Sequence, residues 1–267
     1  MIKLMAVDMD GTFLTSEKTY NRARFTDIYA EMKRQDVKFV VASGNQYYQL
    51  KSFFPEIAKE ISFVAENGAL VISEEEELFC GQMSDELVID VLDFMSKQPD
   101  VSMIMCGRKS AYTHEKESVE FVESSRKYYH RLQVVPEITT TIDDIFFKVA
   151  TNVPKDQTEE FITLFNHHFS GRLTAVTSGH GDIDLIIPGL HKANGLQLLQ
   201  EKWQIDPSEM VTFGDGGNDV EMLRHVKYGY AMANASERAK EAASFFAPSN
   251  EDEGVLVVME EMLKIRK

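Results

Sequence analysis

The chain has 267 residues, of which 43% are hydrophobic, and this is enough to bury the cores of one large or two smaller domains. Its formal net charge of −15 argues against nucleic acid or an anionic membrane surface as the main partner, although local positive charge could hold a small phosphorylated molecule. With two cysteines, no signal-peptide pattern and no stretch near the ~20 apolar residues of a membrane helix, we expect a cytoplasmic protein, with a monomer as the default.

Short apolar runs that end in small or acidic residues predict strands buried in a parallel sheet, because they are apolar on both faces. These strands are predicted at 2–8, 38–44, 62–68 and 210–216. Helical spacing of apolar residues follows at 22–35, 194–203, 220–226 and 254–265. Asn234 is a candidate N-cap of a further helix, with Glu237 three residues after it. Alternating strands and helices indicate an α/β fold with helices on both sides of the sheet.

The middle of the chain lacks acidic strand ends and predicts an inserted α+β module. Its strands are predicted at 101–107, 145–153, 172–178 and 182–187, and its helices at 84–97, 115–130 and 155–168. We place the core domain at 1–82 and 186–267 and the inserted domain at 83–185. The acidic run Glu74–Glu77, just before the insertion, predicts a solvated hairpin tip.

Two aspartates follow the first predicted strand in the segment "AVDMDGTFLTS". In an extended segment Asp8 and Asp10 project the same way, and such a crowded pair requires a cation unless one carboxyl takes up a proton. Mg²⁺, which prefers oxygen ligands, is the natural cation, and Gly11 allows a sharp turn. The same letters begin an EF-hand loop, but that motif requires Glu where this chain has Thr19.

A second acidic cluster, "GDGGNDVEML", follows the predicted strand at 210–216 and opens a helix. Asp215 lies at the strand end, where its carboxylate could reach the same metal ion. Asn218 and Asp219 lie at the start of the helix, whose free N–H groups favour anions.

Two further junctions offer groups suited to phosphate. Ser43 and Gly44 follow a strand and supply a hydroxyl and a backbone N–H, and Lys192 precedes a helix and supplies positive charge. Taken singly, Ser43 is more simply a helix cap and Lys192 a surface lysine. Their occurrence together with two acidic strand ends favours a phosphate site.

These four segments, "DMDGT", Ser43 in "ASGN", Lys192 in "HKANG" and "GDGGND", resemble the four motifs of the haloacid-dehalogenase (HAD) superfamily over the whole chain. The insertion and "AENG" at 65–68 resemble the Cof-type subgroup, and the chain is similar to its bacterial sugar phosphatases. The resemblance implies a Rossmann-like parallel-sheet core with an inserted cap domain that selects the substrate.

The resemblance also implies an Mg²⁺-dependent phosphatase that acts on small sugar phosphates, such as hexose and pentose phosphates. Asp8 would be the nucleophile that forms an aspartyl-phosphate, and Asp10 the general acid and base. The metal would be held by the Asp8 carboxylate, the Asp10 backbone carbonyl and Asp215. Asp219 would steady Lys192 or water bound to the metal.

Ser43, Gly44, Lys192 and Asn218 would hold the phosphoryl group, with smaller contributions from Gly11 and Thr12. Many relatives have Arg where this chain has Asn45, so a fixed positive charge is missing there. In the insertion, His180 and Asp182 are candidate contacts to the substrate.

Two other functions use similar chemistry. A phosphomutase shares the aspartyl-phosphate but returns the phosphoryl group to a sugar. A non-enzymatic phospho-acceptor module, such as a receiver domain, also combines aspartates with a hydroxyl and a lysine. The paired Asp8 and Asp10 and the large insertion disfavour this second alternative.

Overall fold

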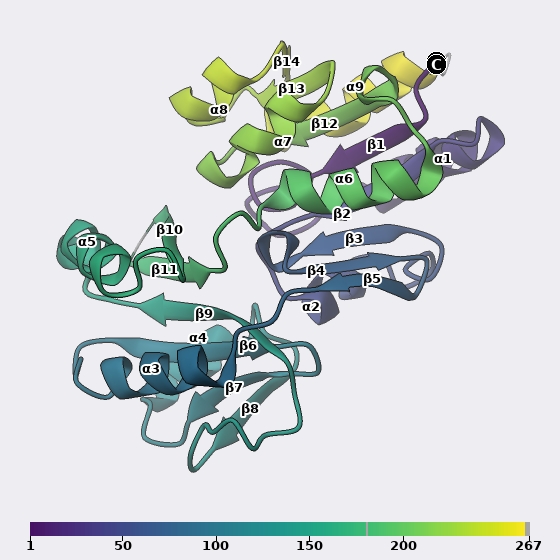
Figure 1. Ribbon diagram of the computed structural model, residues 1–267. Coiled ribbons are helices and arrows are strands. Elements are labelled where there is room, and N and C mark those ends of the chain that lie inside the picture. Colours follow the sequence, from purple (N-terminus) through teal and green to yellow (C-terminus); the bar gives the residue numbers. More distant parts are fainter. Residues whose placement is uncertain (180, 265–267) are drawn as a thin grey trace. The chain divides into compact units, whose positions relative to one another are not determined.

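The computed structural model describes residues 1–179 and 181–264 (Figure 1). They form two compact units. The core unit contains residues 1–44, 54–78 and those from His191 onward, and the inserted unit contains residues 45–53 and the described part of 79–190. These bounds differ by a few residues from the predicted ones, and the segment 45–53, predicted in the core, clusters with the insertion.

The core sheet has the strand order β14-β13-β12-β1-β2-β3-β4-β5. Its strands are β1 (Leu4–Val7), β2 (Lys38–Ala42), β3 (Ser62–Ala65), β4 (Leu70–Ser73), β5 (Glu76–Cys80), β12 (Met210–Gly214), β13 (Tyr228–Met232) and β14 (Phe245–Ala247). Neighbours from β14 to β3 are parallel, and β4 returns antiparallel to β3. The α/β prediction is therefore confirmed. The exposed Glu74 and Glu75 form the turn between β4 and β5, whereas Glu76 and Glu77 of the predicted tip already belong to β5.

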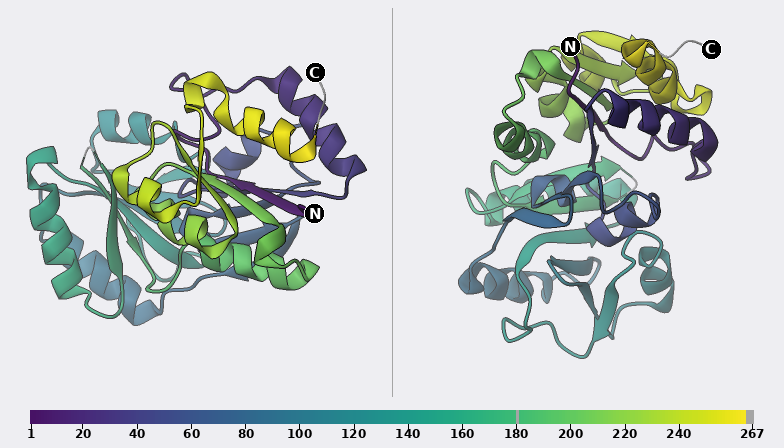
Figure 2. Two further views of the ribbon diagram at one scale, coloured as in Figure 1. Left: turned by 90° about the horizontal axis from the view of Figure 1, so that it is seen from above. Right: turned by 90° about the vertical axis from the view of Figure 1, so that its right-hand side faces the viewer.

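Helices cover both faces of this sheet. On one face α1 (Arg22–Arg34) packs beside α9 (Gly254–Leu263), and the other face carries α6 (Lys192–Trp203), α7 (Val220–His225) and α8 (Glu237–Ala242) (Figure 2). Short 3₁₀ turns are η1 (Glu66–Gly68), η3 (Pro207–Glu209), η4 (Gly217–Asp219) and η5 (Asn250–Asp252).

The prediction that Asn234 caps a helix is wrong. Helix α8 is capped by Ser236, whose side chain accepts a hydrogen bond from the Ala239 N–H. Asn234 instead donates from Nδ2 to the carbonyl oxygen of Gly11 at 2.8 Å. Asn234 and Ser236 are both residue types that favour the N-cap and lie two positions apart, so the sequence alone did not distinguish them.

The inserted unit is an α+β module with the strand order β10-β11-β9-β6-β7-β8. Its strands are β6 (Ser102–Gly107), β7 (Ala111–His114), β8 (Leu132–Val135), β9 (Phe146–Asn152), β10 (Thr174–Gly179) and β11 (Asp182–Ile186). Its helices are α2 (Tyr47–Ser52), α3 (Asp85–Met95), α4 (Val119–Ser125) and α5 (Thr158–His168), with η2 (Lys155–Gln157) before α5. One apolar cluster joins α3 and α5 to the sheet through residues that include Val91, Phe165, Val149 and Leu185.

Sequence patterns missed β7 and β8, and they overextended α4. Both strands have four residues, which is too short for periodicity to identify them, and they flank the helix predicted at 115–130. No helix in the described part of the chain is both long and apolar enough to cross a membrane.

Arg24 joins the two helices on one face of the core sheet. Arg24 lies in α1, and its guanidinium contacts Glu253, the N-cap of α9, at 2.6 Å. It also contacts both carboxylate oxygens of Glu260, within α9, at 2.7 Å. The hydrogen bond from Arg24 holds the pKa of Glu253 below its usual value. A carboxylate with a lowered pKa stabilises the fold above its unfolded-state pKa and loses that contribution as the pH falls through the folded value.

We predict that Arg24→Met lowers the free energy of unfolding by about 1–2 kcal/mol at neutral pH, since part of the ion pair is open to solvent. The deficit should shrink as the pH falls below about 4, where the carboxylates protonate. Urea unfolding at a series of pH values measures it, and Arg34→Met, which removes an exposed pair with Glu31, is the control. An equal deficit at every pH would assign the effect to packing of the Arg24 chain.

Candidate active site

The carboxyl ends of adjacent parallel strands bring the predicted site residues to one edge of the core sheet. Asp8 follows β1, Asp215 follows β12 on one side of it, and Ser43 follows β2 on the other. The Asp8 N–H donates to the carbonyl oxygen of Phe213 at 3.0 Å, so the sheet ladder fixes the backbone at the first aspartate. This edge is where open α/β sheets bind ligands.

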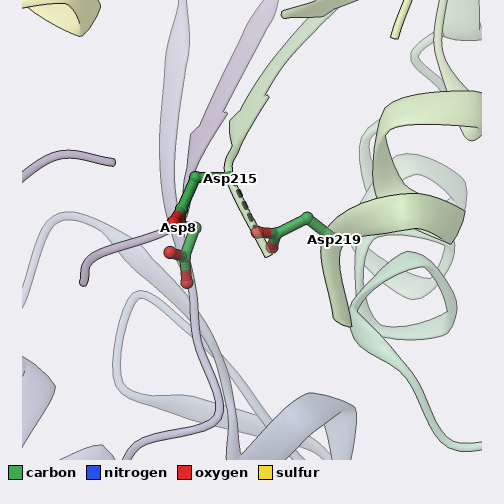
Figure 3. A group of neighbouring side chains, drawn as sticks. All are labelled: Asp8, Asp215 and Asp219. Carbon is green, nitrogen blue, oxygen red and sulfur yellow. Dashed lines mark hydrogen bonds between the residues drawn. The ribbon is translucent and has the colours of Figure 1, made fainter. Parts of the chain in front are cut away.

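Three carboxylates converge at this edge (Figure 3). Asp8 and Asp215 come from the two strand ends, and Asp219 approaches from the helical turn η4. One oxygen from each of the three lies within 4.8 Å of the others.

Lys192 lies among these carboxylates and is 1% exposed. Its Nζ is 2.6 Å from Oδ1 of Asp8 and 2.6 Å from Oδ1 of Asp219. Burial alone would lower the pKa of Lys192, but the two carboxylates outweigh it and raise the pKa above its usual value. The simpler expectation of a surface lysine is therefore wrong, and the ammonium stays charged.

One ammonium does not balance three carboxylates. Burial raises the pKa of Asp8 well above its usual value, although Lys192 opposes the shift. Burial, with the nearby charge of Asp219, raises the pKa of Asp215 to about 6. A hard divalent cation would relieve this repulsion, and carboxylate oxygens are its preferred ligands, so the residues present fit Mg²⁺.

The hydrogen bonds indicate which carboxylates could face such an ion. Both oxygens of Asp219 are already used: Oδ1 accepts from Lys192, and Oδ2 accepts from the N–H groups of Asp215 and Gly216 at 2.9 Å. Asp8 and Asp215 are then the carboxylates suited to the ion, and Asp219 holds its neighbours in place.

Gly11 and Thr12 support Asp215 directly. The Thr12 hydroxyl donates to Oδ1 of Asp215 at 2.8 Å. Gly11 has φ +76°, and a Cβ atom there would lie 2.5 Å from Oδ2 of the same carboxylate. Both the left-handed backbone and this close approach require glycine.

The expectation that Asp8 and Asp10 lie in one extended segment is wrong, and their carboxylates have different partners. Strand β1 ends at Val7 and the chain turns at once, so the alternation of an extended strand does not apply. The Asp10 carboxylate instead pairs with Nζ of Lys18 at 2.5 Å, and both side chains are partly exposed. No sequence signal singled out Lys18.

Ser43 is 3% exposed and does not cap the next helix, since α2 begins at Tyr47 with Gln46 as its N-cap. Asn218 is exposed and donates from Nδ2 to Oδ1 of Asn67 at 3.1 Å. Sequence reasoning gave no role to Asn67, although its "AENG" segment was recognised as a family-like feature.

Two candidates lie in the inserted unit. Asp182 begins β11 and accepts a hydrogen bond from Nδ2 of Asn152 at 2.8 Å. Asn45 begins the segment 45–53. His180 lies outside the described residues.

Comparisons with known proteins agree with this architecture. Residues 5–259 match the family of haloacid dehalogenase-like hydrolases. The chain is 49% identical over 263 residues to the 5-amino-6-(5-phospho-D-ribitylamino)uracil phosphatase YbjI of Escherichia coli. The match covers 98% of this chain and 97% of that protein. The chain is 22% identical to the 5-amino-6-(5-phospho-D-ribitylamino)uracil phosphatase YitU of Bacillus subtilis, over 98% of each chain. The solved structure of SMU.1108c from Streptococcus mutans matches with a TM-score of 0.91 and 36% identity, covering 99% of this chain and 100% of that one.

We predict that Lys192→Met lowers the free energy of unfolding by about 3–5 kcal/mol, because it leaves buried carboxylates without their ammonium. Adding Asp219→Asn should recover part of this loss by removing one buried charge. Denaturant unfolding of both variants measures the effect, and Lys97→Met, which breaks an exposed pair with Asp93, is the control. A Lys192→Met protein as stable as the wild type would contradict the charge balance.

Proposed function

Because the chain belongs to the haloacid dehalogenase-like hydrolase family, we propose that it is an Mg²⁺-dependent phosphatase that acts through an aspartyl-phosphate. We propose as substrates small metabolites with a phosphate on a hydroxyl of a sugar or sugar alcohol. The observation that carries the proposal is the buried Lys192 that joins Asp8 to Asp219 next to Asp215. This arrangement combines a fixed carboxylate, a charged ammonium and a cation site at one sheet edge.

In the proposed first step, a carboxylate oxygen of Asp8 bonds to phosphorus and the ester P–O bond breaks. Asp10 gives its proton to the departing oxygen. In the second step, Asp10 takes a proton from water, the water oxygen bonds to phosphorus, and the Asp8 carboxylate is released with inorganic phosphate. Asp8 is suited to the first role because Lys192 and the sheet ladder fix its position.

Positive charge must offset the repulsion between the Asp8 carboxylate and an anionic phosphate. Lys192 supplies one such charge, and Ser43, Gly44 and Asn218 are proposed to donate hydrogen bonds to phosphoryl oxygens. When bound by Asp8, Asp215 and the Asp10 carbonyl, Mg²⁺ would neutralise further negative charge. Asp10 must leave Lys18 to reach the reacting oxygens, and both side chains are exposed enough to move.

The relatives support the substrate class. The names of the Escherichia coli and Bacillus subtilis proteins describe a phosphate at the end of a ribityl chain, which derives from a sugar alcohol. This chemistry and the sugar phosphates expected from the sequence share a phosphate monoester on a polyhydroxylated chain. We propose that the inserted domain, 83–185, is the cap that selects among such substrates.

We predict phosphate release from 5-amino-6-(5-phospho-D-ribitylamino)uracil and from several hexose and pentose phosphates when Mg²⁺ is present. Asp8→Asn should lower kcat at least about 10³-fold, and Asp10→Asn should also remove nearly all turnover. The assay measures free phosphate, with sugar products separated to detect isomerisation. Turnover that persists in Asp8→Asn would exclude the covalent route, and isomerised sugar phosphate in place of free phosphate would identify a mutase.

We predict that Asp215→Asn raises the Mg²⁺ concentration for half-maximal activity by about tenfold or more, because it removes a carboxylate ligand. Calorimetric titration of Mg²⁺ into the protein should report the same weakening without substrate. Asp27→Asn, on the exposed side of α1, is the matched acidic control. Unchanged Mg²⁺ affinity in Asp215→Asn would remove this residue from the metal site.

A further inference from the structure

The turn η1 has a backbone that few sequences accept. Glu66, Asn67 and Gly68 have φ values of 53°, 56° and 91°, so three consecutive residues lie in the left-handed region. Asparagine and glycine tolerate this region, but glutamate rarely adopts it. Such backbone persists only where surrounding contacts fix it, and it is concentrated at functional sites.

Asn67 contacts two of the three loops proposed to hold phosphate. Its N–H donates to the carbonyl oxygen of Ser43 at 3.0 Å, and its Oδ1 accepts from Nδ2 of Asn218 at 3.1 Å. Its side chain also lies against Gly44, where a Cβ atom would approach Nδ2 of Asn67 to 3.0 Å. Asn67 itself is only 5% exposed, so these contacts are made inside the core unit.

The last residue of the turn contacts the third loop. A Cβ atom on Gly68 would lie 2.5 Å from the carbonyl oxygen of His191. His191 is the N-cap of α6, and Lys192 is the first residue of that helix. The turn therefore lies against all three segments that carry Ser43, Asn218 and Lys192.

The hydrogen bond to Asn67 also sets the orientation of the Asn218 side-chain amide, that is, the positions of its NH₂ group and its oxygen. A primary amide has one acceptor and one donor end, and a phosphate oxygen requires the donor. Because Oδ1 of Asn67 accepts one N–H of Asn218, the NH₂ group must lie on the Asn67 side of the amide. Its second N–H can then donate to a phosphoryl oxygen.

We propose that Asn67 is a positioning residue for phosphoryl transfer. It orients the Asn218 amide and sets the Ser43–Gly44 backbone at a fixed distance from it, and it does not touch the substrate. This inference rests on the proposed phosphate site, and it concerns a residue outside the four motifs.

Asn67→Gly tests the side chain separately from the backbone, because glycine accepts the left-handed conformation without strain. We expect kcat/KM to fall about tenfold, which is what the loss of one orienting hydrogen bond would produce. The melting temperature should stay close to that of the wild type. Gln204→Gly is the matched control, since Gln204 is also left-handed, with φ 54°, but ends α6 at an exposed position.

A double-mutant cycle with Asn218→Ala separates positioning from a general structural effect. If Asn67 acts through Asn218, the double variant should be no slower than Asn218→Ala alone. Fully multiplicative losses, or an Asn67→Gly enzyme within about twofold of the wild type, would overturn the inference.

Calorimetric titration with inorganic phosphate in the presence of Mg²⁺ gives a readout that needs no turnover. Phosphate affinity should fall about tenfold in Asn67→Gly and stay unchanged in Gln204→Gly. A wild-type protein that binds phosphate but hydrolyses no ester would refute the proposed function, whereas weaker phosphate binding in Asn67→Gly would still support the orientation of Asn218 by Asn67. A wild-type protein that neither binds phosphate nor hydrolyses any ester would overturn both.

Discussion

The buried ammonium of Lys192 is the interaction on which the site depends. A charge without access to water is tolerated only when it is paired, and here Asp8 and Asp219 each lie 2.6 Å from it. Asp219 in turn accepts the N–H groups that follow β12, at Asp215 and Gly216. One chain of hydrogen bonds therefore connects the end of β1, the start of α6 and the end of β12. Moving β1 away from α6 would separate Asp8 from Lys192, and moving the end of β12 would take two N–H donors from Asp219.

The same contacts leave the site with excess negative charge, and this explains its proposed dependence on a cation. Burial works against ionisation of Asp8, yet a nucleophilic carboxylate must be ionised. Lys192 provides part of the compensation, but it is shared with Asp219. A divalent ion next to Asp8 and Asp215 would supply the rest and would attract the phosphate dianion. Burial and the proposed nucleophilic role therefore make opposite demands on the Asp8 carboxylate, and a bound divalent ion would reconcile them.

The fold and the position of the site could be predicted because parallel strands buried on both faces are apolar runs, and Asp8, Ser43 and Asp215 mark their ends. The contacts that orient these residues could not. Lys18 pairs with Asp10, and Asn67 accepts a hydrogen bond from Asn218, but lysine and asparagine are common residue types that attract no notice in a sequence. Asn67 and Asn218 are also 151 positions apart. No local pattern encodes such pairs. Strands β7 and β8 were missed for a different reason, since four residues carry too little periodicity.

The two aspartates of the first motif differ in environment in the way that their proposed roles require. Asp8 is buried, and the sheet and Lys192 hold it, so it can attack from one position. Asp10 is 35% exposed and is paired with Lys18, which is 50% exposed. An acid that protonates a leaving oxygen and then accepts a proton from water must reach two places in turn. Its loop is nevertheless anchored, because Asn234 holds the Gly11 carbonyl and Asn250 holds the Leu14 carbonyl. The backbone of Asp10 is therefore fixed near Asp8, while its carboxylate can exchange Lys18 for the reacting oxygens.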